Sequence, residues 1–434
     1  MSVPETRVYV LFNIELVDVE FFTLNDATKG LLNGTYPLGG DALVDVTQFV
    51  QSVSIDRGKS RELDRFAAGN ATVVFHNDNR WFDPFYTASP YYQQFEPRRK
   101  VVITTNGLVQ FTGFIDDIDI SYQLGNKSFA RISCVDGFIQ LSSAQLESFT
   151  NVEQLPGARI TAILNRPEVN WPLADRNLDT GVQLLQDDTV QTGTNALSYL
   201  QTVEQSEPGS LFIAKDGKLT FKDRVNTPPV IEDVAFTDDG SVNSIAYNNI
   251  EVVYGSENLY NRVVITRVGG TAQVADDVAS QALYGIQSLS QDNLLMNSDE
   301  NALVLAEYLV DQYSTPELRF STLSFTLHDK TEAEQNKILN LEINDAVRIA
   351  FTPNNIGDPI SEYALITGIK HRVGIDQHYV DINFGEITNF PFILDDAVYG
   401  VLSGNVPVYS SPTATYDEVV NYEGELNETY PLAF

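Results

Sequence analysis

The segment that decides the fold is VVITTNGLVQFTGFIDDIDISY, residues 101–122. Two runs rich in β-branched and aromatic residues flank Asn106-Gly107. This arrangement is the strongest short-range signal of a β-hairpin. The runs NATVVFHND (70–78) and SFARISCVD (128–136) predict further strands on either side of it. We therefore expect an antiparallel meander in the N-terminal part of the chain.

The same order of elements occurs again toward the C-terminus. The first set is RFAAGNATVVFHND, RRKVVITTN, VQFTGFIDDIDISY and KSFARISCVDG, and the second is LRFSTLSFTLHD, NDAVRIAFTP, YALITGIKHRVGID and HYVDINFGE. The alignment pairs Thr112-Gly113 with Thr367-Gly368 and Ile132 with Ile382, and the second set carries an additional loop, NNIGDPIS. The alternative is a chance likeness between two meanders. A true repeat predicts two tube-like antiparallel β-barrels of similar topology.

The segment between the two sets has a different pattern. Apolar residues at helical spacing predict helices over 156–166 and 194–207, the second capped by Thr194 or Asn195. Asp216-Gly217 predicts a hairpin over 211–224. A further helix is expected over 298–314, with Ser298 as its N-cap.

The fold class expected is therefore mainly β with an α+β insertion. The predicted domains are a first β-barrel at 1–148, an α+β domain at 149–230, a second β-barrel with one long helix at 231–390, and an acidic extended C-terminal tail at 391–434.

The charge of the chain excludes several classes of protein. The 434 residues contain 27 Lys and Arg against 59 Asp and Glu, a net charge of −32. Residues 225–434 carry 8 basic and 31 acidic residues. Such a surface repels phosphate, which argues against a sequence-reading nucleic-acid binder or a binder of anionic membranes. No apolar run of about 18 residues predicts a membrane-spanning helix, and no secretory signal is expected at the start.

The motifs of common enzymes and metal sites are not present. The sequence has no phosphate-binding loop, no Gly-x-Ser-x-Gly and no His-Glu-x-x-His. His371 and His378 flank a predicted hairpin, and we expect exposed or hydrogen-bonded strand residues rather than a metal pair. On a strand Asp117 and Asp119 share one face and Asp116 lies on the other, which favours a solvated hairpin face over a calcium site. Cys134 is expected to be a core residue. We predict no cofactor, no metal and no catalytic residue, although a carboxylate pair of a glycan hydrolase is not excluded by 59 acidic residues.

One aromatic cluster surrounds Pro84 and Pro90. Its members are Trp81, Phe82, Phe85, Tyr86, Tyr91 and Tyr92. A sugar-binding platform is one interpretation. We favour a loop that is pinned onto a barrel or buried in a subunit interface, because aromatic residues are enriched in both places.

The sequence also resembles a known family. VDVTQFVQSVSIDRGKSRELDRFAAGNATVVFHNDNRWFDPFY (44–86) is similar to minor tail proteins of long-tailed bacterial viruses, in which an Arg-Gly turn, a basic segment and an Ala-Gly strand precede Asn-x-x-Arg-x-Phe-Asp-Pro. SPYYQQFEPRRKVVI (89–103), FTGFIDDI (111–118), CVDGFIQLSS (134–143), LQTVEQSEPGSLFIAKDGKLTFKDR (200–224) and NRVVITRVGGTAQVADDVASQALYG (261–285) continue the same order. The resemblance covers residues from about 40 to 387.

The resemblance implies a tail-tip or baseplate hub, similar to the N-terminal part of tail-associated lysozymes. It implies a homotrimer in which two barrels per chain form a six-fold-like ring around the channel for DNA and the tape-measure protein. The expected partners are the distal tail protein, the tail tube and the central spike or tail fibres, and the expected location is the virion tail tip, after synthesis in the host cytoplasm. The alternatives are a hexameric distal tail protein, a receptor-binding tail protein that uses the aromatic cluster, and a cell-wall hydrolase.

Overall fold

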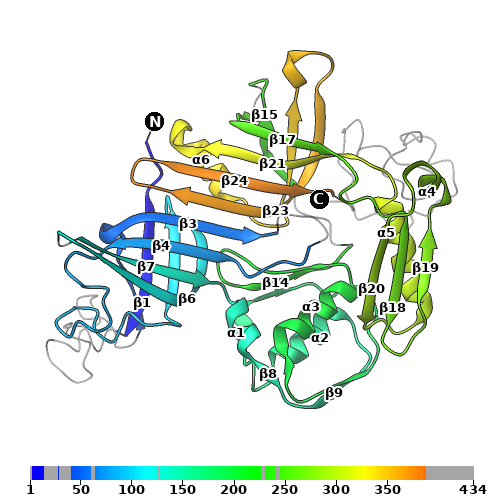
Figure 1. The fold of residues 1–434 in the computed structure, drawn as a ribbon, viewed down its shortest axis with the longest axis horizontal. Coiled ribbons are helices and arrows are strands. Elements are labelled where there is room, and N and C mark those ends of the chain that lie inside the picture. The colour runs from blue at the N-terminus through cyan, green and yellow to red at the C-terminus, as the bar shows by residue number, and fades with distance from the viewer. Residues whose placement is uncertain are drawn as a thin grey trace.

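The computed structural model describes residues 2–13, 28, 41–59, 64–125, 127–225, 230–240 and 244–387. The tail predicted at 391–434 lies outside these residues. The protein is mainly β, and most of its strands belong to one 14-stranded sheet (Figure 1). Eleven strands follow one path: β16 (Ser244–Ile245), β15 (Val230–Thr237), β22 (Ala346–Phe351), β23 (Ile360–Val373), β3 (Val50–Gly58), β4 (Asn70–His76), β7 (Lys127–Val135), β6 (Leu108–Gln123), β5 (Lys100–Thr105), β1 (Thr6–Asn13) and β2 (Asp41–Asp45). On the other side of β23 the sheet continues through β24 (His378–Gly385), β21 (Leu318–Thr326) and β17 (Asn249–Tyr254).

The two separate barrels predicted from the repeat are not found. In the described part of the chain no set of strands closes on itself, and both sets belong to the single sheet. The reason is that β23 pairs with β3 of the other set along residues 368–373. Alternation in the sequence defines the strands but does not determine which edge each one joins.

The two sets of strands nevertheless have the same pairing order. The order β3-β4-β7-β6-β5 in the first set matches β17-β21-β24-β23-β22 in the second. In the first set Val73 of β4 lies opposite Ile132 of β7, and in the second set Leu323 of β21 lies opposite Ile382 of β24 at the equivalent position. Each set also has a register shift at the same place, beside Asp116 in β6 and beside Thr367 in β23.

The structural alignment corrects the one made from sequence. When Ile132 is aligned with Ile382, the two register shifts align Asp116 with Thr367. Thr112-Gly113 and Thr367-Gly368 are therefore not equivalent. The flanking strands differ too, because β1 is antiparallel to β5 whereas β15 is parallel to β22.

The α+β segment has its own core. Helices α1 (Phe138–Ser143), α2 (Pro156–Leu164) and α3 (Ala196–Ser206) pack with β13 (Ser210–Ile213) and β14 (Leu219–Lys222) around Leu164, Leu200 and Phe221. β10 (Arg176–Leu178) completes this small sheet, and the pairs β8 (Gln145–Leu146) with β12 (Thr194–Asn195) and β9 (Phe149–Asn151) with β11 (Asp188–Val190) lie beside it. Asn195, one of the two residues predicted for this role, caps α3 by accepting a hydrogen bond from the Ser198 amide.

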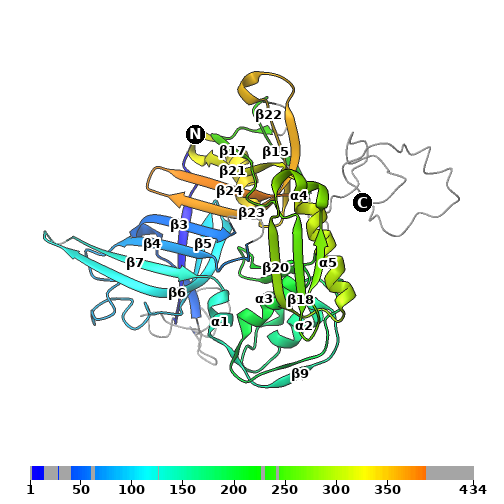
Figure 2. The ribbon, with the colours of Figure 1, turned by 45° about the vertical axis from the view of Figure 1, so that its right-hand side comes forward.

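The long predicted helix is α5 (Asp299–Tyr313), capped by Ser298. It covers a separate three-stranded sheet of β18 (Arg262–Arg267), β19 (Gln273–Asp276) and β20 (Ser288–Leu294), beside the short helix α4 (Val278–Tyr284). Leu305 and Leu309 of α5 pack there with Val263 and Ile265. Figure 2 shows this layer beside the large sheet.

Helix α6 (Glu332–Asn340) was not predicted. Its N-terminus carries a full capping box, in which Thr331 and Glu334 exchange hydrogen bonds with each other's backbone amide. The motif Thr-x-x-Glu at 331–334 is a sequence signal that could have identified it. Within the described residues no helix is long and apolar enough to cross a membrane.

A charge cluster around the buried Arg57, with Glu342 and Lys215 half-buried, joins three parts of the fold. Glu342, which follows α6, accepts hydrogen bonds from the Arg57 guanidinium at 2.8 Å and from the Lys215 amide at 2.8 Å. The Lys215 ammonium donates to the carbonyl oxygens of residues 339–341, at the C-terminal end of α6. Arg57 belongs to the first set of strands, Lys215 to the α+β part and Glu342 to the second set.

A substitution at Gly58 can test how closely β3 and β23 approach each other. Its φ is +95°, and a Cβ atom there would lie 2.2 Å from the Thr367 carbonyl oxygen. Gly58→Ala should lower the free energy of unfolding by about 1–3 kcal/mol from backbone strain and by about 1–3 kcal/mol more from the clash. Urea unfolding measures the loss.

Gly125→Ala is the matched control, because Gly125 has a φ of +97° with nothing within 4 Å of the added Cβ. We expect it to show the strain cost alone. Equal losses in the two variants would contradict a tight contact at Gly58.

Candidate functional site

One candidate surface is a face of the large sheet. Eight strands, β17-β21-β24-β23-β3-β4-β7-β6, lie side by side across both sets (Figure 1). Their apolar side chains point to the two buried cores, for example Val53, Val73 and Ile132 in the first core and Leu323 and Ile382 in the second. The other face is polar and carries Glu251, Thr322, Asp381, Lys370, Asp56, Thr72, Arg131 and Asp119.

Charges of both signs occur on this polar face. Two carboxylates are paired across strands: Asp56 with Lys370 at 3.2 Å and Asp381 with Arg372 at 2.8 Å. Asp117, Asp119 and Glu251 lie on the two outermost strands, β6 and β17, and all three are exposed. The predicted solvated face at Asp116, Asp117 and Asp119 is therefore observed. No described residues form a cluster of three or more His, Cys, Asp or Glu side chains suited to a metal ion.

The polar face ends at two open strand edges. In the second set, residues 368–373 of β23 pair with β24 on one side and with β3 on the other. In the first set, the equivalent residues 117–122 of β6 pair with β7 only, and β17, the equivalent of β3, pairs with β21 only. Among the described strands none covers these two edges. Tyr122 at the first edge is 60% exposed, and Tyr254 at the second is 70% exposed.

The six aromatic residues singled out in the sequence do lie together, but in different environments. Phe82 is fully buried and stacks on Phe75, with ring centroids 4.6 Å apart. Trp81 and Tyr91 are half-buried against the same core, and the Trp81 ring meets Phe49 edge-on. Tyr86 and Tyr92 are also half-buried, whereas Phe85 is 87% exposed.

A buried carboxylate holds this aromatic segment in place. Asp83 accepts hydrogen bonds from the Tyr122 hydroxyl at 2.6 Å, from the Arg80 guanidinium at 2.6 Å and from the Phe85 amide at 2.9 Å. Burial alone would raise the pKa of Asp83, but the hydrogen bonds from Tyr122 and Arg80 hold it below its usual value. The contact with Tyr122 fixes the segment beside the open edge of β6.

The two histidines of the β23–β24 hairpin are buried rather than exposed. His371 Nδ1 and His378 Nε2 lie 3.1 Å apart, which confirms the hydrogen-bonded alternative. The second nitrogen of each ring has no hydrogen-bond partner. Burial lowers the pKa of His378 to about 4, with His328 adding to the effect, and lowers that of His371 well below its usual value. Both rings are therefore neutral at pH 7.

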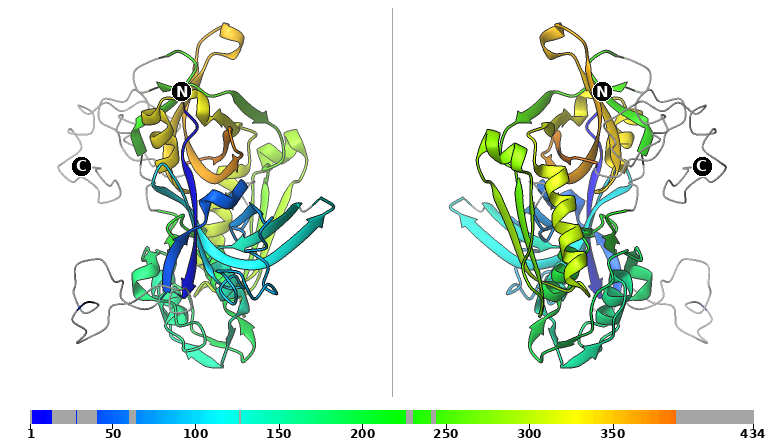
Figure 3. Two further views of the ribbon diagram at one scale, coloured as in Figure 1. Left: turned by 90° about the vertical axis from the view of Figure 1, so that its left-hand side faces the viewer. Right: turned by 90° about the vertical axis from the view of Figure 1, so that its right-hand side faces the viewer.

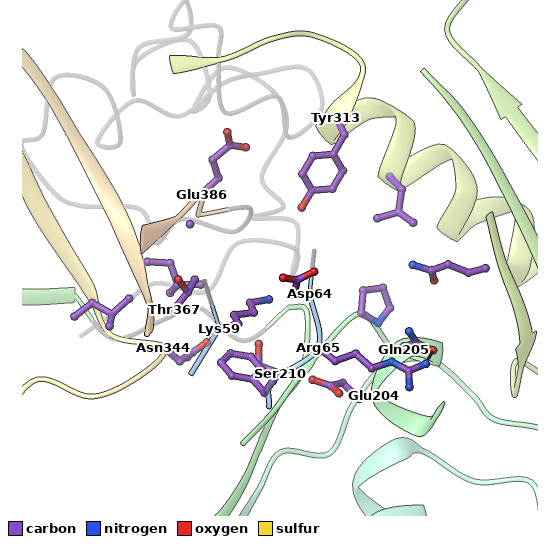
Figure 4. A pocket seen from close by; sticks show the side chains of 18 of the residues that line it. Lys59, Asp64, Arg65, Glu204, Gln205, Ser210, Tyr313, Asn344, Thr367 and Glu386 are labelled. Atoms are coloured by element: carbon purple, nitrogen blue, oxygen red, sulfur yellow. Dashed lines mark hydrogen bonds between the residues drawn. The ribbon is translucent and has the colours of Figure 1, made fainter. Parts of the chain in front are cut away.

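A pocket opens where the large sheet, the α+β part and α5 meet (Figure 4). Glu204 lies at its wall, 5% exposed, and its Oε1 accepts a hydrogen bond from the Leu211 amide at 2.8 Å. Burial raises the pKa of Glu204 to about 7, although the nearby Lys59 and Arg65 oppose this. Cys134 is buried as predicted, and burial raises the pKa of its thiol strongly. Its fully packed position gives it no access to a substrate.

The comparisons with known proteins point to one kind of fold. No protein-family model matches the chain, and no curated protein sequence does. Its structure is similar to the 43 kDa tail protein of prophage MuSo2 from Shewanella oneidensis, with 12% identity, a TM-score of 0.55, and coverage of 88% of this chain and 97% of that one. It is equally similar to a tail protein from Neisseria meningitidis MC58, with 12% identity, a TM-score of 0.55, and coverage of 88% and 96%. Over most of its length the chain therefore has the fold of phage tail proteins, as the resemblance in the sequence implied.

Sequence reasoning missed the two open edges and the cluster of Arg57, Glu342 and Lys215. Neither leaves a local signal, because each depends on which distant segments meet. The resemblance implies a turn at Arg57-Gly58, whereas both residues complete β3.

The buried histidine pair predicts an acid sensitivity. The folded pKa of His378 lies below the unfolded value of about 6.5, so the folded state binds fewer protons. This contribution to stability is complete above pH 6.5 and is lost as the pH falls toward 4. His378→Gln should therefore lose less free energy of unfolding than the parent between pH 7 and pH 4, by about 3 kcal/mol.

Denaturant unfolding at a series of pH values measures this difference. His76→Gln is the control, because His76 is exposed and should keep the pH dependence of the parent. Parallel pH curves for His378→Gln and the parent would contradict the assignment.

Proposed function

We propose that this protein is a structural hub of a phage tail tip, in which three copies form a ring with pseudo-six-fold symmetry. The fold of phage tail proteins supports the class. Two equivalent sets of strands per chain support the symmetry, because three chains then supply six similar units. In this reading the sets are tube-like units, at 1–148 and 231–390, and the α+β part at 149–230 is a domain between them.

The observation that carries the proposal is the complementarity of the two open edges. Within the chain, β3 of the first unit pairs with β23 of the second. The equivalent strands, β17 and β6, are the ones left open. They do not pair with each other within the chain, where they form the opposite ends of the eight-strand sheet (Figure 1). If β17 of one copy pairs with β6 of the next, the contact between the copies has the same form as the contact between β3 and β23 within one chain. When the rotation from one copy to the next closes after three copies, the result is a ring.

The internal junction also predicts the register between copies. Val373 lies opposite Val53, and Arg372 lies opposite Ser54. The equivalent residues place Tyr122 of one copy opposite Ile250 of the next, and Ser121 opposite Glu251. Val373 packs on the core of the first unit, so Tyr122 would pack on the second core of the neighbouring copy. Its 60% exposure in the single chain fits a side chain that is covered on assembly.

In this ring the polar face of the eight strands would line the channel. Asp117, Asp119 and Glu251 would then face the axis close to each junction between copies. Carboxylates at these positions repel the phosphates of passing DNA, so DNA would traverse the ring without specific binding. A lining dominated by Lys and Arg would contradict this expectation.

The work of such a protein is assembly rather than turnover of a substrate. We propose no catalytic role and no cofactor. The partners would be the distal tail protein and tail tube on one side, the central spike or fibres on the other, and the tape-measure protein in the channel. The protein would be made in the host cytoplasm and would reside at the tail tip of the virion, where host attachment and genome ejection begin.

A charge change at one position tests the proposed register in both directions. Ser121→Glu would place a carboxylate directly opposite Glu251 of the next copy, and Ser121→Lys would place an ammonium there. Like charges on facing strands are destabilising and opposite charges stabilising, by about 0.2–1 kcal/mol per pair. The Glu variant should dissociate at higher concentrations than the parent trimer, and the Lys variant at lower ones, by several-fold at each of the junctions.

Native mass spectrometry and sedimentation across a concentration series give the readout. Thermal unfolding of each variant is the control for folding. Because Ser121 is exposed, we expect both variants to unfold at the temperature of the parent. A parent chain that stays monomeric at every concentration would contradict the ring, and identical effects of Glu and Lys would contradict the register.

A further inference from the structure

We infer that the aromatic turn, residues 80–95, is the docking surface for the tip loop, residues 352–359, of a neighbouring copy. This inference rests on the proposed ring and adds a second contact to it, away from the paired strands.

A contact of the same kind already exists inside the chain. Asn106, at the turn between β5 and β6, donates hydrogen bonds from its side-chain amide to Gln335 Oε1 at 3.2 Å and to Asn336 Oδ1 at 3.0 Å, both on α6. Gln110 donates to the Leu339 carbonyl oxygen at 3.1 Å. Leu108, next to this turn, packs against the core of the second unit rather than its own. The β5–β6 turn of the first unit therefore contacts α6 of the second unit beside the pairing of β3 with β23.

Each of the two partners of that contact has an equivalent in the other unit. The turn between β5 and β6 corresponds to the tip loop between β22 and β23. The strand pair that closes the turn is Thr105 with Leu108, and the pair that closes the tip loop is Phe351 with Ile360. The connection that contains α6 joins β21 to β22, and the aromatic turn lies in the corresponding connection from β4 to β5. Where β17 of one copy meets β6 of the next, the same geometry brings the tip loop of the first onto the aromatic turn of the second.

Exposed apolar side chains mark both surfaces. Phe85 is 87% exposed although the rings around it are buried or half-buried, and Ile356 is 75% exposed at the end of the tip loop. The loop projects from the molecule at the top of Figures 1 and 2, and Figure 3 shows it beyond the sheet from both sides. Single exposed apolar side chains are common on protein surfaces, so these two support the contact through their place in the equivalent geometry and not through exposure alone.

The tip loop is built to hold that shape. The Thr352 amide donates to Asp238 Oδ2 at 2.9 Å, and the Ile356 amide donates to the Pro353 carbonyl oxygen at 3.0 Å. Asn354, Asn355 and Gly357 all have positive φ. These residues tolerate that region better than others, so the loop turns tightly on both sides of Ile356 and presents its side chain outward.

The charges of the two surfaces are complementary. Asp358 is the only charged residue of the tip loop, and it is exposed. The segment that follows the aromatic turn, residues 96–100, carries the three cations Arg98, Arg99 and Lys100 and one carboxylate, Glu96. Arg98 and Glu96 are exposed, and Glu96 lies 4.0 Å from the Arg99 guanidinium. Opposite charges at the rim of a small apolar contact favour one orientation of the partners.

Cysteine cross-linking tests the contact directly, because the single native cysteine, Cys134, is buried and does not compete. The double variant Phe85→Cys/Ile356→Cys is treated with a short bismaleimide and run on a denaturing gel. We expect covalent dimers and trimers, which can form only between copies. The control is Leu173→Cys/Ile356→Cys, because Leu173 is 76% exposed but lies in the α+β part. It should remain at the mass of one chain.

Native mass measured before cross-linking separates this inference from the proposed ring. A trimer that yields no covalent dimer with the Phe85 and Ile356 cysteines would overturn the contact and leave the ring intact. A chain that is monomeric throughout would overturn both. If the contact forms, Ile356→Asp should also raise the concentration at which the trimer dissociates by at least tenfold, without changing the thermal unfolding of the single chain.

Discussion

The pairing of β23 with β3 is the contact on which the rest of the structure depends. It joins residues 368–373 to residues 53–58, and so connects two units that are more than 250 residues apart in the chain. Gly58 permits the approach, because any side chain there would collide with the backbone of β23. Val373 of the second unit packs on the first core and Leu108 of the first unit packs on the second. The two cores are therefore interlocked, and the eight strands form one continuous face.

This junction is directional, and that has a consequence for assembly. Along the eight-strand face each unit has two different edges, and the internal junction uses one edge from each. The two edges of this face that remain are of opposite kinds, so a junction that repeats the internal one between copies is head-to-tail rather than two-fold symmetric. Open strand edges also invite uncontrolled pairing, and charged residues are a common protection against it. Asp117 and Asp119 on β6 and Glu251 on β17 fit that role in the single chain.

Buried polar groups hold the other parts of the molecule to this sheet. Glu342 links Arg57 to Lys215, and Lys215 in turn covers the last carbonyl oxygens of α6. Asp83 ties the aromatic turn to the end of β6 through Tyr122. Removing one partner from such a cluster leaves a buried charge without compensation, which costs more than a surface pair. The position of the α+β part and the shape of the aromatic turn are thus determined by a few specific contacts and not by apolar burial alone.

The sequence by itself determined the local structure. Asn106-Gly107 identified the central hairpin, Ser298 and Asn195 identified helix starts, and the order of strands revealed the two sets, because turn chemistry and side-chain periodicity act over a few residues. It also indicated that the aromatic residues at 81–92 lie together. It did not show that the two sets share one sheet, that His371 and His378 are buried against each other, or that Phe85 alone is exposed among the six aromatic residues at 81–92. Those features depend on which strand edges meet and on the register at which they pair, and backbone hydrogen bonding between distant strands carries almost no residue-specific signal. Only the tertiary structure decided which edges of the sheet were left open.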